Sequence, residues 1–152
     1  TLLVVKRYRQ LGLNTPLITE ARLSNEGRLD RLIRDIYHKT DPHQKILVMG
    51  ITFKPDVPDT RNSKALELAE DLSTKRNTFV MDPFIEQSDF SHLNVVDNFS
   101  NGPFDLLVYA VNHSGFTELH TALDHSIKSD GLIFDVTGEL KLPENHNRQY
   151  IR

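Results

Sequence analysis

The feature that most constrains the fold is a run of mostly apolar residues, KILVMGI, at residues 45–51. A short run without polar alternation is typical of a strand that is buried on both faces of a parallel sheet. Two more runs of this kind, FDLLVYAV at 104–111 and GLIFDV at 131–136, follow later in the chain. Shorter strand patterns occupy 77–83 and 93–97. The sequence therefore predicts five strands.

Amphipathic patterns at 63–75 and 116–127 predict helices between these strands. Alternating strands and helices form βαβ units, and right-handed crossovers then favour a doubly wound parallel sheet. We predict an α/β fold, a three-layer Rossmann-like parallel sheet of about five strands in the order 3-2-1-4-5. Ligands of such sheets bind beyond the carboxyl ends of the strands, beside the first strand.

Helical patterns also precede the first strand, at 2–11 and 24–38. The polar stretch TDPHQ at 40–44 is the best candidate for a boundary between these helices and the sheet. The predicted organisation is a helical segment over 1–40 and an α/β domain over 41–152. Because the chain opens inside a helical pattern and without Met, we expect it to be a piece of a longer protein.

Composition excludes several classes of function. The net charge of −3 gives no basic surface for nucleic acid, and no apolar run approaches the length of a membrane span. The chain has no cysteine, which excludes disulfides, thiolate metal sites and a cysteine nucleophile within these residues and fits a cytoplasmic protein. His120 and His125 are five residues apart, a spacing that suits no helical metal motif.

The candidate site is the loop after the first strand, at 51–62. Phe53 offers a flat face to a base or sugar, and Lys54 offers a point charge for phosphate. Arg61 precedes the next helix, so its guanidinium and the free N–H groups of that helix face the same anion. The simpler interpretation is an ordinary strand-to-helix turn with solvated cations. The loop lacks a GxGxxG turn, which argues against NAD binding in the usual dinucleotide manner.

Other interpretations stay open at this point. A non-catalytic α/β interaction module or a small-ligand-binding module fits the same fold. A receiver domain is disfavoured, because it needs an aspartate where the first strand here ends in GITFK. His113 lies just after the fourth strand, near the candidate loop, and a structural imidazole is favoured over a catalytic one.

The segment GITFKPDVPDTRNSKALELAEDL at 50–72 closely resembles part of the C-terminal domain of the UDP-glucose/GDP-mannose dehydrogenase family, which carries G-x-x-F-K-x-x-x-x-D-x-R-x-S/T there. Further similarities follow in the same order: Asp82-Pro83, AVNH at 110–113 and FDVTG at 134–138. The opening residues resemble the helices that link the two domains of that family. RNSK and AVNHSGF look most like the branch that acts on UDP-N-acetylhexosamines.

This resemblance implies an NAD-dependent 6-dehydrogenase that oxidises the C6 alcohol of a UDP-sugar to a carboxylate for surface-polysaccharide synthesis. It implies that Phe53 and Lys54 contact the UDP-sugar, and that Arg61 reaches NAD held mainly by another domain. The family reacts through a cysteine-bound thiohemiacetal and thioester. Its nucleophile and NAD domain precede the part of the sequence seen here. We therefore expect no catalytic residue in this chain and no activity from it alone.

The resemblance also implies a homodimer formed through the linking helix, with a UDP-sugar as substrate and no nucleic-acid or membrane partner. An arginine of that helix acts across the dimer in the family. Arg22 and Arg28 both lie near the corresponding place, and either is equally consistent with a solvated side chain. Related sequences often carry D-V-K-G where this chain has Thr137 in place of the lysine.

Overall fold

The computed structural model describes residues 6–8, 10–13, 15–141 and 148–151. The chain divides into two compact units, residues 1–38 and residues 39–152. No described helix combines the length and the hydropathy that crossing a membrane requires.

The long helix α2 spans Pro16–Lys39. The expectation that this helix starts at residue 24 is wrong. Proline suits the first helical position because its missing N–H needs no partner there, and the Thr19 N–H donates to the Thr15 carbonyl at 3.0 Å. The predicted helix at 2–11 is helical at residues 6–8 and 10, and its other residues, except residue 11, lie outside the described part.

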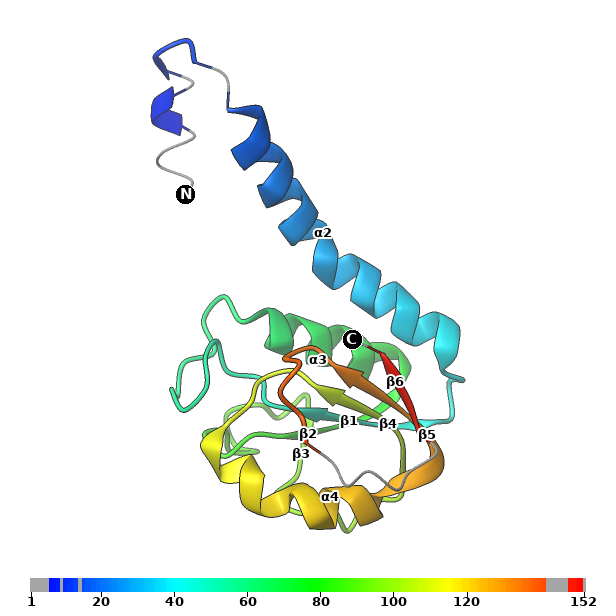
Figure 1. Ribbon diagram of the computed structural model, residues 1–152. Coiled ribbons are helices and arrows are strands. Elements are labelled where there is room, and N and C mark those ends of the chain that lie inside the picture. Colours follow the sequence, from blue (N-terminus) through cyan, green and yellow to red (C-terminus); the bar gives the residue numbers. More distant parts are fainter. Residues whose placement is uncertain (1–5, 9, 14, 142–147, 152) are drawn as a thin grey trace. The chain divides into compact units, whose positions relative to one another are not determined.

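The second unit contains a parallel sheet in the order β3-β2-β1-β4-β5-β6 (Figure 1). This confirms the predicted order 3-2-1-4-5 and adds a sixth strand at the β5 edge. The strands are β1 Lys45–Met49, β2 Asn77–Met81, β3 Asn94–Val95, β4 Phe104–Tyr109, β5 Ile127–Asp135 and β6 Gln149–Ile151.

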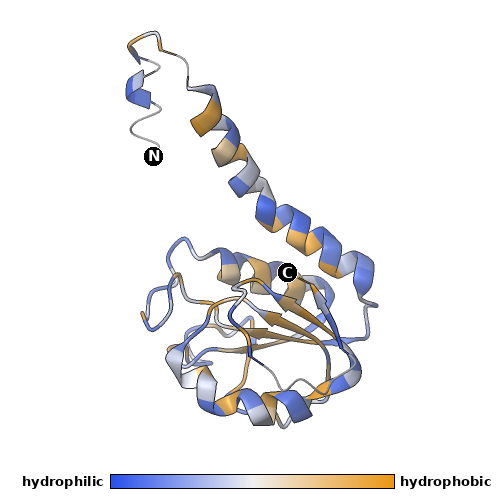
Figure 2. Ribbon diagram, viewed as in Figure 1, coloured by the Kyte–Doolittle hydropathy of each residue, from blue (hydrophilic) through white to orange (hydrophobic). Residues whose placement is uncertain are grey.

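Helices cover the two faces of this sheet. Helix α3, Lys64–Lys75, lies over one face, and the 3₁₀ helix η1, Ser114–Leu119, leads into α4, His120–Ser126, over the other (Figure 1). Leu47 and Met49 of β1 belong to the core cluster beneath η1 and α4. Ile46 and Val48 point to the opposite face, because side chains alternate along a strand. Both faces are buried, as the hydrophobic colouring of the strands in Figure 2 illustrates.

The junction of α4 and β5 differs from the prediction of one helix over 116–127 followed by a strand from residue 131. The helix ends at Ser126 and β5 begins at Ile127. The pairing with β4 slips here, because Phe104 lies opposite Ile127 whereas Leu106 lies opposite Leu132. The extra residues of β5 make the pairing irregular here, which a periodicity argument does not reveal.

Candidate functional site

The loop between β1 and α3 leaves the sheet through Gly50. The Gly50 N–H donates to the Met81 carbonyl at 2.9 Å, and its φ is +81°. A Cβ atom on this residue would lie 2.4 Å from the Val111 carbonyl oxygen. Only glycine fits here, because the end of β1 passes directly against the chain that leaves β4.

The loop then folds back on itself. The Phe53 N–H donates to the Asp59 carbonyl at 2.7 Å, and Asp56 adopts a left-handed φ of 57°. The Phe53 side chain is 53% exposed, and the Lys54 Nζ lies 5.7 Å from the centre of its ring. The structure therefore brings the two predicted substrate-binding side chains together in solvent, with the ammonium held by a cation–π contact.

Arg61 lies at the end of the loop, with a side chain that is 87% exposed. Its Nε and Nη2 donate to Asp59 Oδ1 and Oδ2 at 2.9 and 2.8 Å. This fork lowers the pKa of Asp59 to about 2, because the guanidinium stabilises the carboxylate through hydrogen bonds and charge. The Ser63 Oγ caps α3 by accepting from the Leu66 N–H. Arg61 is thus presented at the start of α3 and oriented by Asp59.

A buried polar network beneath the loop was only partly visible in the sequence. His113 follows β4 and is fully buried. Its Nε2 lies 3.0 Å from Thr52 Oγ1 and 3.1 Å from Asp82 Oδ2, and its Nδ1 accepts from the Asp56 N–H at 3.0 Å. The position of His113 beside the loop was a usable signal, but nothing in the sequence indicated these three partners.

Asp82 bears on whether this sheet fits a dinucleotide. In dinucleotide-binding sheets a carboxylate downstream of the glycine-rich turn accepts from the ribose hydroxyl. Here Asp82 Oδ2 accepts from Ile51 N and Thr52 N at 2.7 and 3.1 Å, and Oδ1 accepts from Phe84 N at 2.9 Å. Both oxygens of Asp82 already accept from the protein's own backbone and the side chain is fully buried, so it does not present an exposed carboxylate to a ribose. The residues of this sheet therefore do not fit NAD in that manner, and Arg61 offers a single anion contact.

A second group of polar residues occupies the carboxyl ends of β4 and β5. The Tyr109 hydroxyl donates to Asn112 at 2.6 Å, and the Asn112 amide donates to Glu139 at 2.6 Å. Burial, together with the charges of Asp135 and Glu139, raises the pKa of Tyr109 to about 12. Thr137 donates its hydroxyl to Asp135 Oδ1 at 2.8 Å, so it stabilises the turn after β5.

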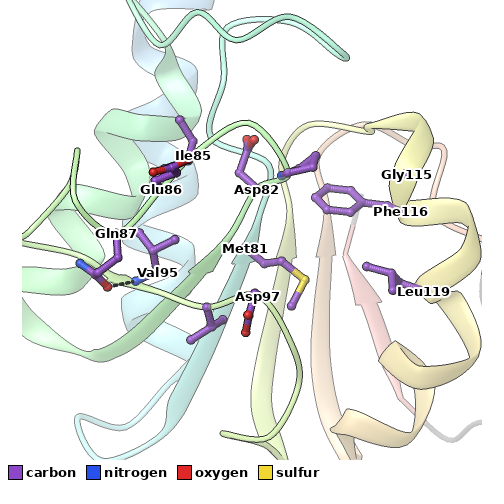
Figure 3. A pocket seen from close by; sticks show the side chains of 12 residues that line it. Met81, Asp82, Ile85, Glu86, Gln87, Val95, Asp97, Gly115, Phe116 and Leu119 are labelled. Atoms are coloured by element: carbon purple, nitrogen blue, oxygen red, sulfur yellow. Dashed lines mark hydrogen bonds between the residues drawn. The ribbon is translucent and has the colours of Figure 1, made fainter.

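A pocket of about 560 Å³ opens beside the ends of β2 and β3 (Figure 3). Met81, Val95 and Phe116 contribute apolar atoms to its lining, and Glu86 and Asp97 contribute carboxylates. Asp82, which accepts hydrogen bonds from the first residues of the β1–α3 loop, also lines this pocket, so the pocket and the loop are adjacent. Among the described residues, no cluster of three or more histidine or acidic side chains is arranged to hold a metal ion.

These features define a Rossmann-like α/β domain with an aromatic and cationic loop at the carboxyl edge of its sheet. The sequence profile of the UDP binding domain of the UDP-glucose/GDP-mannose dehydrogenase family matches residues 47–141. The chain belongs to this family, which confirms the resemblance seen in the sequence.

Individual proteins resemble this chain in sequence or in fold. The chain is 33% identical over 124 residues to the UDP-N-acetyl-D-glucosamine 6-dehydrogenase of Pseudomonas aeruginosa, a match that covers 74% of this chain and 29% of the relative. GDP-mannose dehydrogenase of P. aeruginosa superposes with a TM-score of 0.74 at 20% identity, over 97% of this chain and 36% of that structure. The UDP-N-acetyl-mannosamine dehydrogenase Cap5O of Staphylococcus aureus superposes with a TM-score of 0.71 at 24% identity, over 89% of this chain and 32% of that structure. The two structures share the fold.

Proposed function

We propose that this chain is the UDP-sugar-binding part of an NAD-dependent UDP-N-acetylhexosamine 6-dehydrogenase. The complete enzyme would oxidise the C6 alcohol of its substrate to a carboxylate for surface-polysaccharide synthesis. The observation that carries the proposal is the exposed Phe53–Lys54 pair at the carboxyl edge of a UDP binding domain. An exposed ring beside an ammonium suits a ligand that joins an apolar ring face to a diphosphate.

The roles of the loop residues follow from their chemistry. Phe53 packs against the uridine or the sugar, and Lys54 binds the diphosphate as a point charge. Arg61, already aligned by Asp59, makes one contact with NAD that other parts of the enzyme hold. These 152 residues contain no cysteine, so they supply no nucleophile for a thiohemiacetal, and the chain alone is expected not to turn over substrate.

We further propose that α2 mediates homodimerisation. Leu17 and Leu23 on this helix are 82% and 56% exposed. A second copy of the helix packed against them would remove these apolar side chains from water, which is favourable. A second copy of the chain is the partner that the resemblance to the family implies.

Isothermal titration of this chain with UDP and UDP-N-acetylglucosamine tests the UDP-binding role. We expect measurable but weak binding of both ligands, and about 10- to 100-fold weaker binding by Lys54→Ala, the loss for one charge-assisted contact. Lys64→Ala is the matched control, because Lys64 is an exposed lysine that pairs with Glu67 on α3. Absence of UDP binding by the unmodified chain at millimolar concentration would overturn the proposal.

A further inference from the structure

His113 is held in a fixed orientation by two aromatic rings. The rings of Phe84 and Phe116 each lie 5.2 Å from the imidazole, centre to centre, the latter edge-on at 82°. The side chain of His113 is fully buried between them. The two aromatic contacts and the burial of the ring restrict the orientation of its two nitrogens.

The hydrogen bonds fix which nitrogen carries the proton. A backbone N–H only donates, so the 3.0 Å contact from the Asp56 N–H makes Nδ1 an acceptor. The proton of the neutral ring then lies on Nε2, facing Asp82 Oδ2 at 3.1 Å and Thr52 Oγ1 at 3.0 Å. The Thr52 hydroxyl donates onward to the Lys54 carbonyl at 3.1 Å.

The partners of His113 flank Lys54 on both sides. Thr52 precedes Lys54 by two residues and Asp56 follows it by two, so a single imidazole holds both ends of this short segment. Asp56 stands in a left-handed conformation that an aspartate adopts only at a cost. Its carboxylate accepts from the Ser114 N–H at 2.9 Å, which adds a second tie to the end of β4.

We propose that His113 is a positioning residue for UDP-sugar binding, a role that rests on the proposed function. It acts mainly through the contact of its Nδ1 with the Asp56 N–H, and it holds the loop so that Phe53 and Lys54 are presented together before the ligand arrives. A preorganised loop binds with less loss of conformational freedom, so its effect is on affinity rather than on the fold. Asp82 is itself fixed in place, because its Oδ2 accepts from the backbone of Ile51 and Thr52 and its Oδ1 accepts from the Phe84 N–H.

Two substitutions of His113 test the contacts of its two ring nitrogens separately. Asparagine places an amide oxygen near the position of Nδ1 and retains an acceptor for the Asp56 N–H. Glutamine reaches the position of Nε2 and retains a donor for Asp82, but it leaves the Asp56 N–H without a partner. We expect His113→Asn to bind UDP within about threefold of the unmodified chain and His113→Gln to bind roughly tenfold more weakly, the loss of one ordering hydrogen bond.

Three further measurements accompany the titrations. Hydrogen exchange at the Asp56 amide should be slow in the unmodified chain and in His113→Asn, and fast in His113→Gln. Thermal melting should fall in both variants, since both lose the packing of the ring. The ¹⁵N shifts of His113 in the unmodified chain should show a proton on Nε2 and a bare Nδ1, a readout that needs neither ligand nor variant.

The outcomes distinguish this inference from the proposed function. If the unmodified chain binds UDP and the two variants bind it equally, the positioning role is wrong and the proposed function stands. A proton on Nδ1, or fast exchange of the Asp56 amide in the unmodified chain, would also overturn the positioning role. If the unmodified chain does not bind UDP, the proposed function fails and the positioning role in UDP binding fails with it; slow exchange at Asp56 would then support only a structural tie.

Discussion

Gly50 sets how closely the end of β1 passes the chain that leaves β4. Its left-handed φ of +81° and the 2.4 Å approach that a Cβ would make to Val111 impose two separate penalties on any other residue. The sequence showed a glycine at the end of an apolar run, which is ambiguous. Only the packing of β1 against β4 explains why this position requires it.

We expect Gly50→Ala to lower the free energy of unfolding by about 2–5 kcal/mol, because backbone strain and a steric overlap add together. Gly138→Ala is the matched control, since Gly138 has a φ of +73° but no atom within 4 Å of an added Cβ. In Gly138→Ala the free energy of unfolding should fall by only about 1–2 kcal/mol. Urea unfolding measures both, and equal losses would show that the contact with Val111 does not matter.

The second residue-level lesson concerns the candidate loop. Phe53, Lys54 and Arg61 were singled out because a strand-to-helix loop at this edge of a parallel sheet is where ligands bind. The structure pairs Phe53 with Lys54 and Arg61 with Asp59. Whether these side chains bind a UDP-sugar and NAD stays a prediction. The hydrogen bonds of His113 were not predictable, because its partners lie 61, 57 and 31 residues away in the sequence.

Among the secondary-structure elements, β6 was missed by the sequence analysis. Its three residues, Gln149–Ile151, carry too little pattern to indicate a strand. Arg148, just before it, is what fastens this edge to the rest of the sheet. Its guanidinium donates to the carbonyls of Lys128, Asp124 and Ile127 at 2.9, 2.6 and 2.8 Å and also pairs with the Asp124 carboxylate.

Removal of this anchor should be costly. The Arg148 side chain is only 7% exposed, and Arg148→Ala would remove its hydrogen bonds to partly buried carbonyls and to the Asp124 carboxylate, so it should lower the free energy of unfolding by about 2–4 kcal/mol. Arg61→Ala breaks an ion pair whose arginine is 87% exposed, and it should cost at most about 1 kcal/mol. Urea denaturation of the two variants checks this contrast, and a small loss in Arg148→Ala would contradict it.

At the scale of the whole molecule, the prediction concerns the association of two copies of the chain. If α2 mediates a homodimer, sedimentation velocity of this chain should show a concentration-dependent dimer. The double substitution Leu17→Glu and Leu23→Glu should shift it to monomer, because burying two carboxylates in an apolar interface is unfavourable. Val57→Glu adds a charge at an exposed apolar residue outside α2 and should leave the dimer unchanged. A monomer at all concentrations before substitution would contradict the proposed interface.

By itself the sequence determined the class of fold, the order of the first five strands and the loop that carries Phe53 and Lys54. These follow from apolar runs, helical periods and chain neighbours, all of which are local properties. Only the tertiary structure decided that backbone N–H groups donate to the Asp82 carboxylate, that His113 supports the loop, and that Arg148 anchors β6. Such contacts join residues that are distant in the sequence, and a hydrogen bond between them forms only when the folded sheet brings their atoms within about 3 Å.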